Sequence, residues 1–250
     1  MTLKDDLAIG LDPAELMIRC GLQPDPWQER VLRSQADRQL LLCCRQSGKS
    51  TTTASLALHT ALYSPGLILL LSPSLRQSQE LFRKIKDAVV VLGESVAVTE
   101  ESALRLEMRN GSRIISLPGT EQTVRGFSGV KLLIIDEASL VADDLYYAIR
   151  PMLGVSRGKL ICLSTPHGKR GFFHKEWSEG SGWERTKITA ADCPRISGEF
   201  LQEERQSLGD WWFQQEYFCE FVQNEDQMFS FEAVNSALSA DVKPLFEVGT

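Results

Sequence analysis

The chain has 250 residues, of which 43% are hydrophobic, and this is enough apolar side chain for the core of one large domain, or of a domain with a small appendage. Its formal net charge of −6 at pH 7 argues against a protein that coats nucleic acid without specificity. No apolar run approaches the roughly 20 residues of a membrane span, and the N-terminus lacks the basic and apolar segments of a signal peptide, so we expect no membrane partner.

Helices and strands are predicted to alternate along the chain. Helices are expected at 14–21, 26–35, from the residue after 50 to about 63, and at 74–92, 143–152, 171–178 and 200–219; strands are expected at 39–44, 67–72, 132–136 and 159–164. Asn110-Gly111 predicts a hairpin that joins 104–108 to 113–117. Because apolar strands are separated by helices, we expect an α/β fold with a mainly parallel, doubly wound sheet flanked by helices.

A phosphate-binding loop is predicted directly after the first strand. Its sequence is Leu40-Leu41-Leu42-Cys43-Cys44-Arg45-Gln46-Ser47-Gly48-Lys49-Ser50-Thr51, which fits G-x-x-x-x-G-K-[ST] except that Cys43 replaces the first glycine. In such a loop, backbone N–H groups and the helix N-terminus surround an anion. We expect Lys49 to reach the β- and γ-phosphates, Ser50 to hold Mg²⁺, and residues 45–51 to form the nucleotide cradle. The alternative is an ordinary helix start.

The segment 131–139 supplies the second half of a nucleotide site. Its apolar run is typical of a central parallel strand, and it ends in Asp136 and Glu137. Ligands bind at the carboxyl ends of such strands. We expect Asp136 to hold Mg²⁺ through water and Glu137 to polarise the water that attacks the γ-phosphate; the alternative is an exposed acidic turn. Because the sequence has no Asn-Lys-x-Asp guanine-binding motif, ATP is the expected nucleotide, and the fold is expected to be that of a RecA-like P-loop NTPase.

Taken together, the motifs resemble one protein family, the ATPase domain of the large terminase subunit, which is the DNA-packaging motor of tailed bacteriophages. The resemblance covers roughly residues 20 to 230. It is carried by Pro26-Trp27-Gln28, the Arg45-containing loop, Asn110-Gly111-Ser112-Arg113-Ile114, Val124-Arg125-Gly126-Phe127-Ser128, Asp136-Glu137-Ala138, Arg150-Pro151-Met152-Leu153 and Leu163-Ser164-Thr165-Pro166-His167-Gly168-Lys169-Arg170-Gly171.

This resemblance implies Mg²⁺-dependent ATP hydrolysis that drives double-stranded DNA into a viral procapsid. The implied setting is a homo-oligomeric ring on the portal, together with the small terminase subunit, in the cytoplasm of an infected bacterium. We expect residues 1–195 to form the ATPase core with its N-terminal helices, and 196–250 to form a small, mostly helical extension. In the family a nuclease domain follows, well beyond residue 250, so no nuclease activity is expected from these residues.

The resemblance also assigns roles to single residues. Gln28 is similar to the glutamine that reads the adenine edge, Arg45 can fork onto γ-phosphate oxygens, and Arg125 resembles a finger inserted into the neighbouring subunit's site. Ser164 and Thr165 match the motif that couples γ-phosphate sensing to DNA movement. The alternatives are a helix-surface glutamine, a solvated loop arginine, an arginine that contacts DNA or forms an ion pair, and hydroxyls that cap a turn before Pro166.

Two other functions remain open from the sequence. A superfamily 2 helicase or translocase fragment shares the adenine-reading glutamine and the Asp-Glu strand end, but a helicase requires a second RecA-like domain in the same chain. A nucleotide-gated DNA-binding module without turnover is a different class. Glu137 argues against it, since a protein that only binds nucleotide requires no base.

Overall fold

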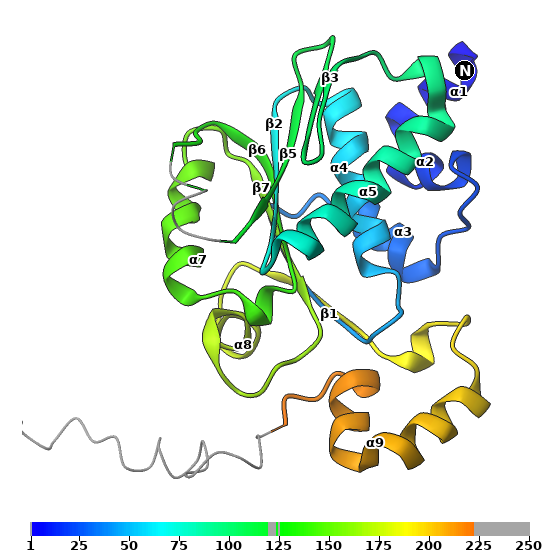
Figure 1. The fold of residues 1–250 in the computed structure, drawn as a ribbon, viewed down its shortest axis with the longest axis vertical. Coiled ribbons are helices and arrows are strands. Elements are labelled where there is room, and N and C mark those ends of the chain that lie inside the picture. The colour runs from blue at the N-terminus through cyan, green and yellow to red at the C-terminus, as the bar shows by residue number, and fades with distance from the viewer. Residues whose placement is uncertain (1, 120–123, 125, 223–250) are drawn as a thin grey trace, which may run out of the picture.

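The computed structural model of the chain describes residues 2–119, 124 and 126–222 (Figure 1). Within these residues an 8-stranded sheet has the order β3-β4-β5-β2-β6-β7-β1-β8. The strands are β1 (Arg38–Cys43), β2 (Leu67–Ser72), β3 (Val98–Glu101), β4 (Arg105–Met108), β5 (Arg113–Pro118), β6 (Val130–Asp136), β7 (Lys159–Ser164) and β8 (Glu184–Ile188). In this order, each strand from β5 to β8 pairs parallel with the next one. At the other end of the sheet, β4 pairs antiparallel with β5, and β3 pairs antiparallel with β4.

Helices cover both faces of the sheet. They are α1 (Leu3–Leu11), α2 (Pro13–Arg19), α3 (Pro26–Arg33), α4 (Lys49–Tyr63), α5 (Leu75–Leu92), α7 (Asp143–Ile149), α8 (Gly171–Ser178) and α9 (Gly198–Phe218). In Figure 1, α4 and α5 lie on one face with α1, α2 and α3 outside them, and α7 and α8 lie on the other face. The predicted doubly wound α/β fold is therefore confirmed, and α9 provides the expected helical extension.

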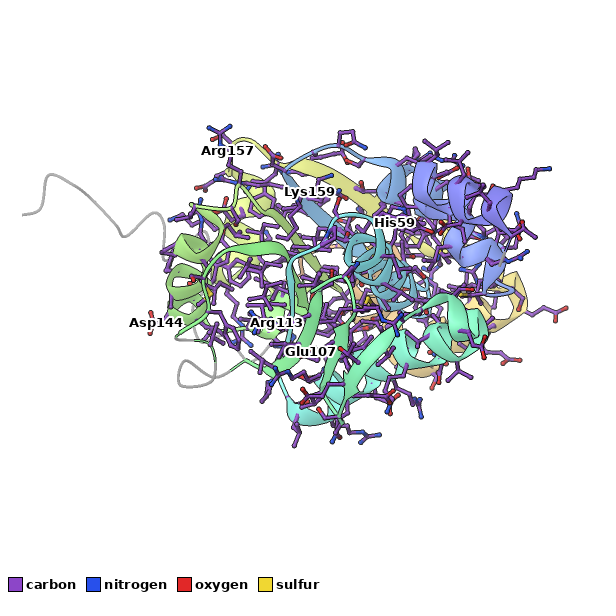
Figure 2. All side chains as sticks on the ribbon, turned by 90° about the horizontal axis from the view of Figure 1, so that it is seen from above. His59, Glu107, Arg113, Asp144, Arg157 and Lys159 are labelled. Atoms are coloured by element: carbon purple, nitrogen blue, oxygen red, sulfur yellow. The ribbon has the colours of Figure 1, made fainter. Side chains whose placement is uncertain are left out.

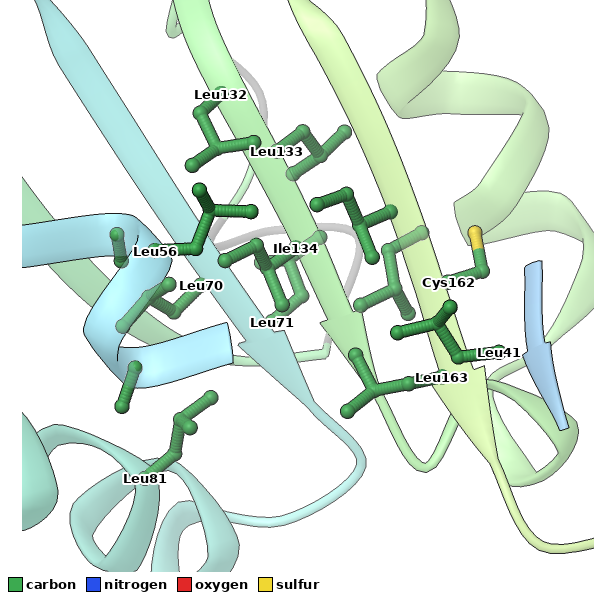
Figure 3. Packing of buried hydrophobic residues seen from close by; sticks show 14 of the residues in the cluster. Leu41, Leu56, Leu70, Leu71, Leu81, Leu132, Leu133, Ile134, Cys162 and Leu163 are labelled. Carbon is green, nitrogen blue, oxygen red and sulfur yellow. The ribbon is translucent and has the colours of Figure 1, made fainter. Parts of the chain in front are cut away.

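The core lies between these helices and the central strands. Strands β2, β6, β7 and β1 are almost entirely apolar and buried on both faces, as expected for parallel strands covered by helices. Figure 3 shows Leu56 of α4 packed against the leucines of β2 and β6. Leu41 of β1 and Cys162 and Leu163 of β7 continue this core on the neighbouring strands. This packing fixes the register of the strands, with Ile134 opposite Ile161 and, at the strand ends, Asp136 opposite Leu163.

The parallel strands all end at one edge of the sheet, the lower edge in Figure 1. Figure 2 looks onto the opposite edge, where Arg113 and Lys159 begin β5 and β7. At that edge Lys159 Nζ donates to the Ser34 carbonyl at 3.1 Å. The carboxyl edge therefore carries the segments that follow β1, β6 and β7, which contain most of the predicted site residues.

The Asn110-Gly111 hairpin is confirmed. Strands β4 and β5 pair antiparallel, with Leu106 opposite Ile114. Gly111 has a φ of 85°, in the left-handed region, and the Asn110 carboxamide oxygen accepts the Ser112 N–H at 3.0 Å.

None of the helices in the described ranges is long and apolar enough to cross a membrane.

Candidate active site

The phosphate loop connects β1 to α4 and takes its shape from Gly48. This residue caps α4 with φ 91° and ψ 14°, which is left-handed backbone that a glycine adopts without strain. A Cβ at Gly48 would lie 2.9 Å from Gln28 Nε2. Inside the loop, Ser47 Oγ donates to the Cys44 carbonyl at 2.9 Å. The start of α4, including Ser50 and Thr51, thus presents free N–H groups and partial positive charge to an anion.

Cys43 is the last residue of β1 and is fully buried. The position at which the motif has its first glycine therefore lies in a strand and not in the loop, and the Cys43 side chain packs into the core. The departure from the sequence pattern thus leaves the loop itself, residues 44–48, intact.

Lys49 meets Glu137 across the carboxyl edge of the sheet. Lys49 Nζ lies 3.0 Å from Glu137 Oε1, and the side chains are only 11% and 22% exposed. Burial opposes the charged form of Lys49, but the carboxylates of Glu137 and Asp136 outweigh burial and raise its pKa above the ordinary value. Lys49 is therefore a cation at neutral pH, held at the mouth of the phosphate loop.

Ser50 and Asp136, the two residues predicted to hold Mg²⁺, contact each other. Ser50 Oγ donates to Asp136 Oδ2 at 3.1 Å, which brings the first turn of α4 against the end of β6. Burial and the neighbouring Glu137 carboxylate raise the pKa of Asp136 to about 6. A hydroxyl beside a buried carboxylate fits Mg²⁺, since proteins hold this ion through one or two carboxylates together with phosphate oxygens and water.

Glu137 is also tied to the end of β7. Its backbone is left-handed, with φ 49° and ψ 46°, which turns it away from the line of β6. While Oε1 contacts Lys49, Oε2 accepts a hydrogen bond from Ser164 Oγ at 3.3 Å. The structure therefore brings the predicted base and the predicted coupling residue into direct contact.

Ser139 is a member of this network that the sequence analysis missed. Its hydroxyl lies 2.6 Å from Ser164 Oγ and donates to the Thr165 carbonyl at 2.9 Å. The Ser139 N–H also donates to Ser164 Oγ, at 3.2 Å. Its only signal in the sequence is its place two residues after Glu137, and its partners come from a strand 25 residues later.

Gln28 lies beside the loop, and both ends of its amide are occupied. Oε1 accepts the Asp25 N–H at 2.8 Å at the start of α3, and Nε2 donates to Thr52 Oγ1 at 2.9 Å. The side chain is buried, with the residue 3% exposed. Gln28 therefore joins α3 to α4 here, and its amide retains a second N–H and a second oxygen lone pair. Its reading of an adenine edge stays a prediction.

Arg45 points to α9. Its side chain is 64% exposed, and its Nε forms an ion pair with Glu216 Oε2. Its backbone N–H donates to the Glu216 backbone carbonyl at 3.0 Å. The hydrogen bond to Glu216 raises the pKa of Arg45 further above its usual range. A contact with γ-phosphate stays a prediction. Arg125 lies outside the described residues.

Arg195 is a second residue that no sequence motif indicated. Its guanidinium forms a fork with Asp25, with Nη1–Oδ1 and Nη2–Oδ2 both at 2.7 Å, and Nη2 also donates to the Ser47 carbonyl at 3.0 Å. Arg195 thus links the start of α3, the phosphate loop and the chain entering α9.

Comparison with known proteins identifies the family of the chain. A family model described as terminase large subunit, T4likevirus-type, N-terminal, matches residues 40–236. The chain is 27% identical over 247 residues to the large terminase subunit of Thermus phage G20c, covering 84% of this chain and 51% of that protein. It thus spans about half the length of this relative.

Two solved structures share the fold. The large terminase ATPase domain of Thermus phage P74-26 superposes with a TM-score of 0.72 at 23% identity, covering 82% of this chain and 97% of that one. The large terminase of the thermophilic bacteriophage D6E in complex with ADP gives 0.65 at 12% identity, covering 80% and 54%. The family match spans most of the chain, and the chain belongs to the family of N-terminal regions of T4likevirus-type large terminase subunits.

Proposed function

We propose that this chain hydrolyses ATP with Mg²⁺ and acts in the motor that translocates double-stranded DNA into a viral procapsid. Family membership supports the setting. The observation that carries the enzymatic proposal is the meeting of Lys49, Ser50, Asp136 and Glu137 at one edge of the sheet. These four side chains come from the start of α4 and from the end of β6, about 86 residues apart in sequence, and each has the chemistry that phosphoryl transfer requires.

Exchange of partners at Lys49 is the first step of the proposed mechanism. In the structure Lys49 is paired with Glu137 at 3.0 Å. A triphosphate in the loop offers Lys49 a stronger anionic partner, and Glu137 is released as it binds. Glu137 is then free to accept a hydrogen bond from the attacking water and take its proton.

Ser50 and Asp136 are the residues that would hold Mg²⁺. Bound there, the ion would supply positive charge that stabilises the negative charge of the phosphates. Asp136 must be ionised for this role, because only the carboxylate binds a hard cation well.

Coupling to movement is proposed to run through Ser164 and Thr165. Because Ser164 donates to Glu137 and contacts Ser139, a change in the position of Glu137 would alter the contacts at the end of β7 directly. We also propose that Arg45 leaves Glu216 to contact γ-phosphate, and that Arg125 acts as a finger in the site of a neighbouring subunit. The small terminase subunit, the portal and the procapsid are the proposed partners of this ring in the infected bacterial cytoplasm.

The direct test of the proposed function is phosphate release from ATP by the wild-type chain and by Lys49→Ala, with Mg²⁺ present. Loss of turnover is expected, because backbone amides alone do not neutralise the phosphate oxygens. Lys84→Ala is the matched control, since Lys84 is an exposed lysine on α5. Equal turnover by Lys49→Ala and wild type would overturn the site assignment.

A further inference from the structure

Two cysteine side chains meet at the start of the phosphate loop. Cys44 Sγ lies 3.9 Å from Cys193 Sγ, and the two residues are buried, at 0% and 1% exposed. Cys44 connects β1 to the phosphate loop, and Cys193 lies in the segment between β8 and α9. The pair of free thiols therefore joins two segments whose positions differ by 149 in the sequence.

The backbone holds both sulfurs in this arrangement. The Cys44 N–H donates to the Ile188 carbonyl at 2.8 Å, at the end of β8. The Cys193 N–H donates to the Ala190 carbonyl at 3.2 Å, and its carbonyl accepts the Ile196 N–H at 2.9 Å. To form a disulfide, the two sulfurs must approach each other by about 2 Å. Rotation about the Cα–Cβ bonds moves a sulfur over a distance of this size, so both strands and the loop can keep their places.

The two thiols have different reactivity. The hydrogen bond between them lowers the pKa of Cys193, although burial opposes this, and the same bond raises the pKa of Cys44. Because the thiolate is the nucleophile, Cys193 is the member that reacts first with an oxidant, and Cys44 is in place to react with the product. Cys193 also lies close to solvent, since its chain neighbours Asp192 and Pro194 are both exposed.

We propose that Cys44 and Cys193 form a redox site, at which hydrogen peroxide converts the two thiols into a disulfide that fastens the phosphate loop to the segment leading into α9. In the first step the Cys193 thiolate attacks one peroxide oxygen and the O–O bond breaks. Cys193 becomes a sulfenic acid, and the departing hydroxide takes up the proton that the Cys193 thiol released.

The second step closes the disulfide. The Cys44 sulfur attacks the Cys193 sulfur, the S–O bond of the sulfenic acid breaks, and the Cys44 proton leaves with the hydroxide as water. In total the two thiols lose two electrons and two protons, and one hydrogen peroxide is reduced to two water molecules.

The disulfide would change how α9 is attached to the phosphate loop. In the reduced chain this attachment includes the partly exposed polar contacts of Arg45 and Arg195, which can exchange partners. A covalent link beside them would remove that freedom, and we expect it to slow ATP turnover. The effect on turnover rests on the proposed function, whereas formation of the disulfide does not.

The test is to treat the native full chain with hydrogen peroxide, block the remaining thiols with N-ethylmaleimide and identify linked peptides by mass spectrometry. We expect loss of two of the six thiols, a link between Cys44 and Cys193, and reversal by dithiothreitol. Because the link closes a long loop, the Tm of the oxidised chain should rise by about 10 °C.

Two matched variants complete the test. Cys193→Ser keeps the size of the side chain but should form no link and show no rise in Tm on oxidation. Cys20→Ser, which removes a half-buried thiol far from the pair in sequence, should form the link as wild type does.

Retention of all six thiols under peroxide, or a link from Cys193 to Cys43 or Cys219 instead, would overturn the inference. Phosphate release from ATP on the same samples should fall on oxidation and return with dithiothreitol, and equal turnover before and after oxidation would refute the fastening of the loop. If reduced wild type releases no phosphate, the proposed function falls, and the linked peptides and the Tm still decide the redox site.

Discussion

The carboxyl edge of the sheet and the α9 region are built differently. At the sheet edge, Lys49, Asp136 and Glu137 are held by strands whose side chains fill the main core, and their charged atoms pair with one another. The α9 region has a small hydrophobic cluster of its own, Ala190, Phe213 and Tyr217, and a break in the helix at Gly209 with φ 77° and ψ 162°. It meets the phosphate loop through polar contacts of Arg45 and Arg195 that are partly exposed.

This difference separates two tasks. Groups that act on the phosphates require fixed positions, and the packed sheet supplies them. Partly exposed ion pairs are weaker and exchange partners readily, so α9 can change its contacts with the loop at a lower energetic cost. If the two tasks are separate, substitutions at the sheet edge change ATP turnover, and substitutions at the α9 contacts mainly change stability.

The largest effect is expected from Glu137→Gln. The amide is nearly the same size but cannot take a proton from water, so turnover should fall by about 10²–10⁴. Steady-state phosphate release measures this, with Glu94→Gln, an exposed glutamate, as control. Normal turnover by Glu137→Gln would show that Glu137 is a structural partner of Lys49 and not the base.

Asp136 should make the Mg²⁺ requirement depend on pH. Its pKa is about 6, raised by burial and by Glu137, so the carboxylate is mostly ionised above pH 6 and mostly protonated below it. Because Mg²⁺ binds the ionised form, the Mg²⁺ concentration for half-maximal turnover should rise as pH falls through 6, by about tenfold per unit below that value. A requirement that stays constant from pH 5 to 7 would contradict this role.

The smallest effect is expected from the Arg45–Glu216 pair. Arg45→Ala and Glu216→Gln both break the ion pair, and each should lower the free energy of unfolding in urea by about 1 kcal/mol, as for a partly exposed pair. If Arg45 also reaches γ-phosphate, Arg45→Ala should reduce turnover clearly more than Glu216→Gln does. Equal turnover in the two variants would restrict Arg45 to the attachment of α9.

The site at the sheet edge could be predicted from the sequence because each of its motifs lies within a few consecutive residues. Gly48-Lys49-Ser50 follows an apolar strand, and Asp136-Glu137 ends another, so parallel pairing alone brings them to one edge. The Asn110-Gly111 hairpin was equally local.

The contacts between the phosphate loop and the α9 region could not be predicted from the sequence. The contact of Arg195 with Asp25 joins positions 170 residues apart, and no motif marks either residue. Strand β8 was missed because it is a polar edge strand with one buried residue, so it lacks the apolar run that predicts a parallel strand. Helix α1 was missed as well, although Thr2 and Asp5 form a capping box at its start.

Several assignments await measurement. The boundary at residue 195 between core and extension, the adenine contact of Gln28 and the finger role of Arg125 all stay predictions. For Arg125, which lies outside the described residues, mixing Arg125→Ala with Glu137→Gln subunits should restore part of the activity of an assembled ring, since some interfaces then contain both intact groups.

The exchange of Lys49 from Glu137 to phosphate is the central claim, and the affinity of Glu137→Gln for ATP tests it most directly. Removing the carboxylate charge frees Lys49 from its ion pair, while Lys49, Ser50 and Asp136 remain in place. Calorimetry in the presence of Mg²⁺ should therefore show that Glu137→Gln binds ATP at least as tightly as wild type, while Lys49→Ala binds it far more weakly. Loss of ATP binding by Glu137→Gln, with Lys49→Ala unaffected, would contradict the account.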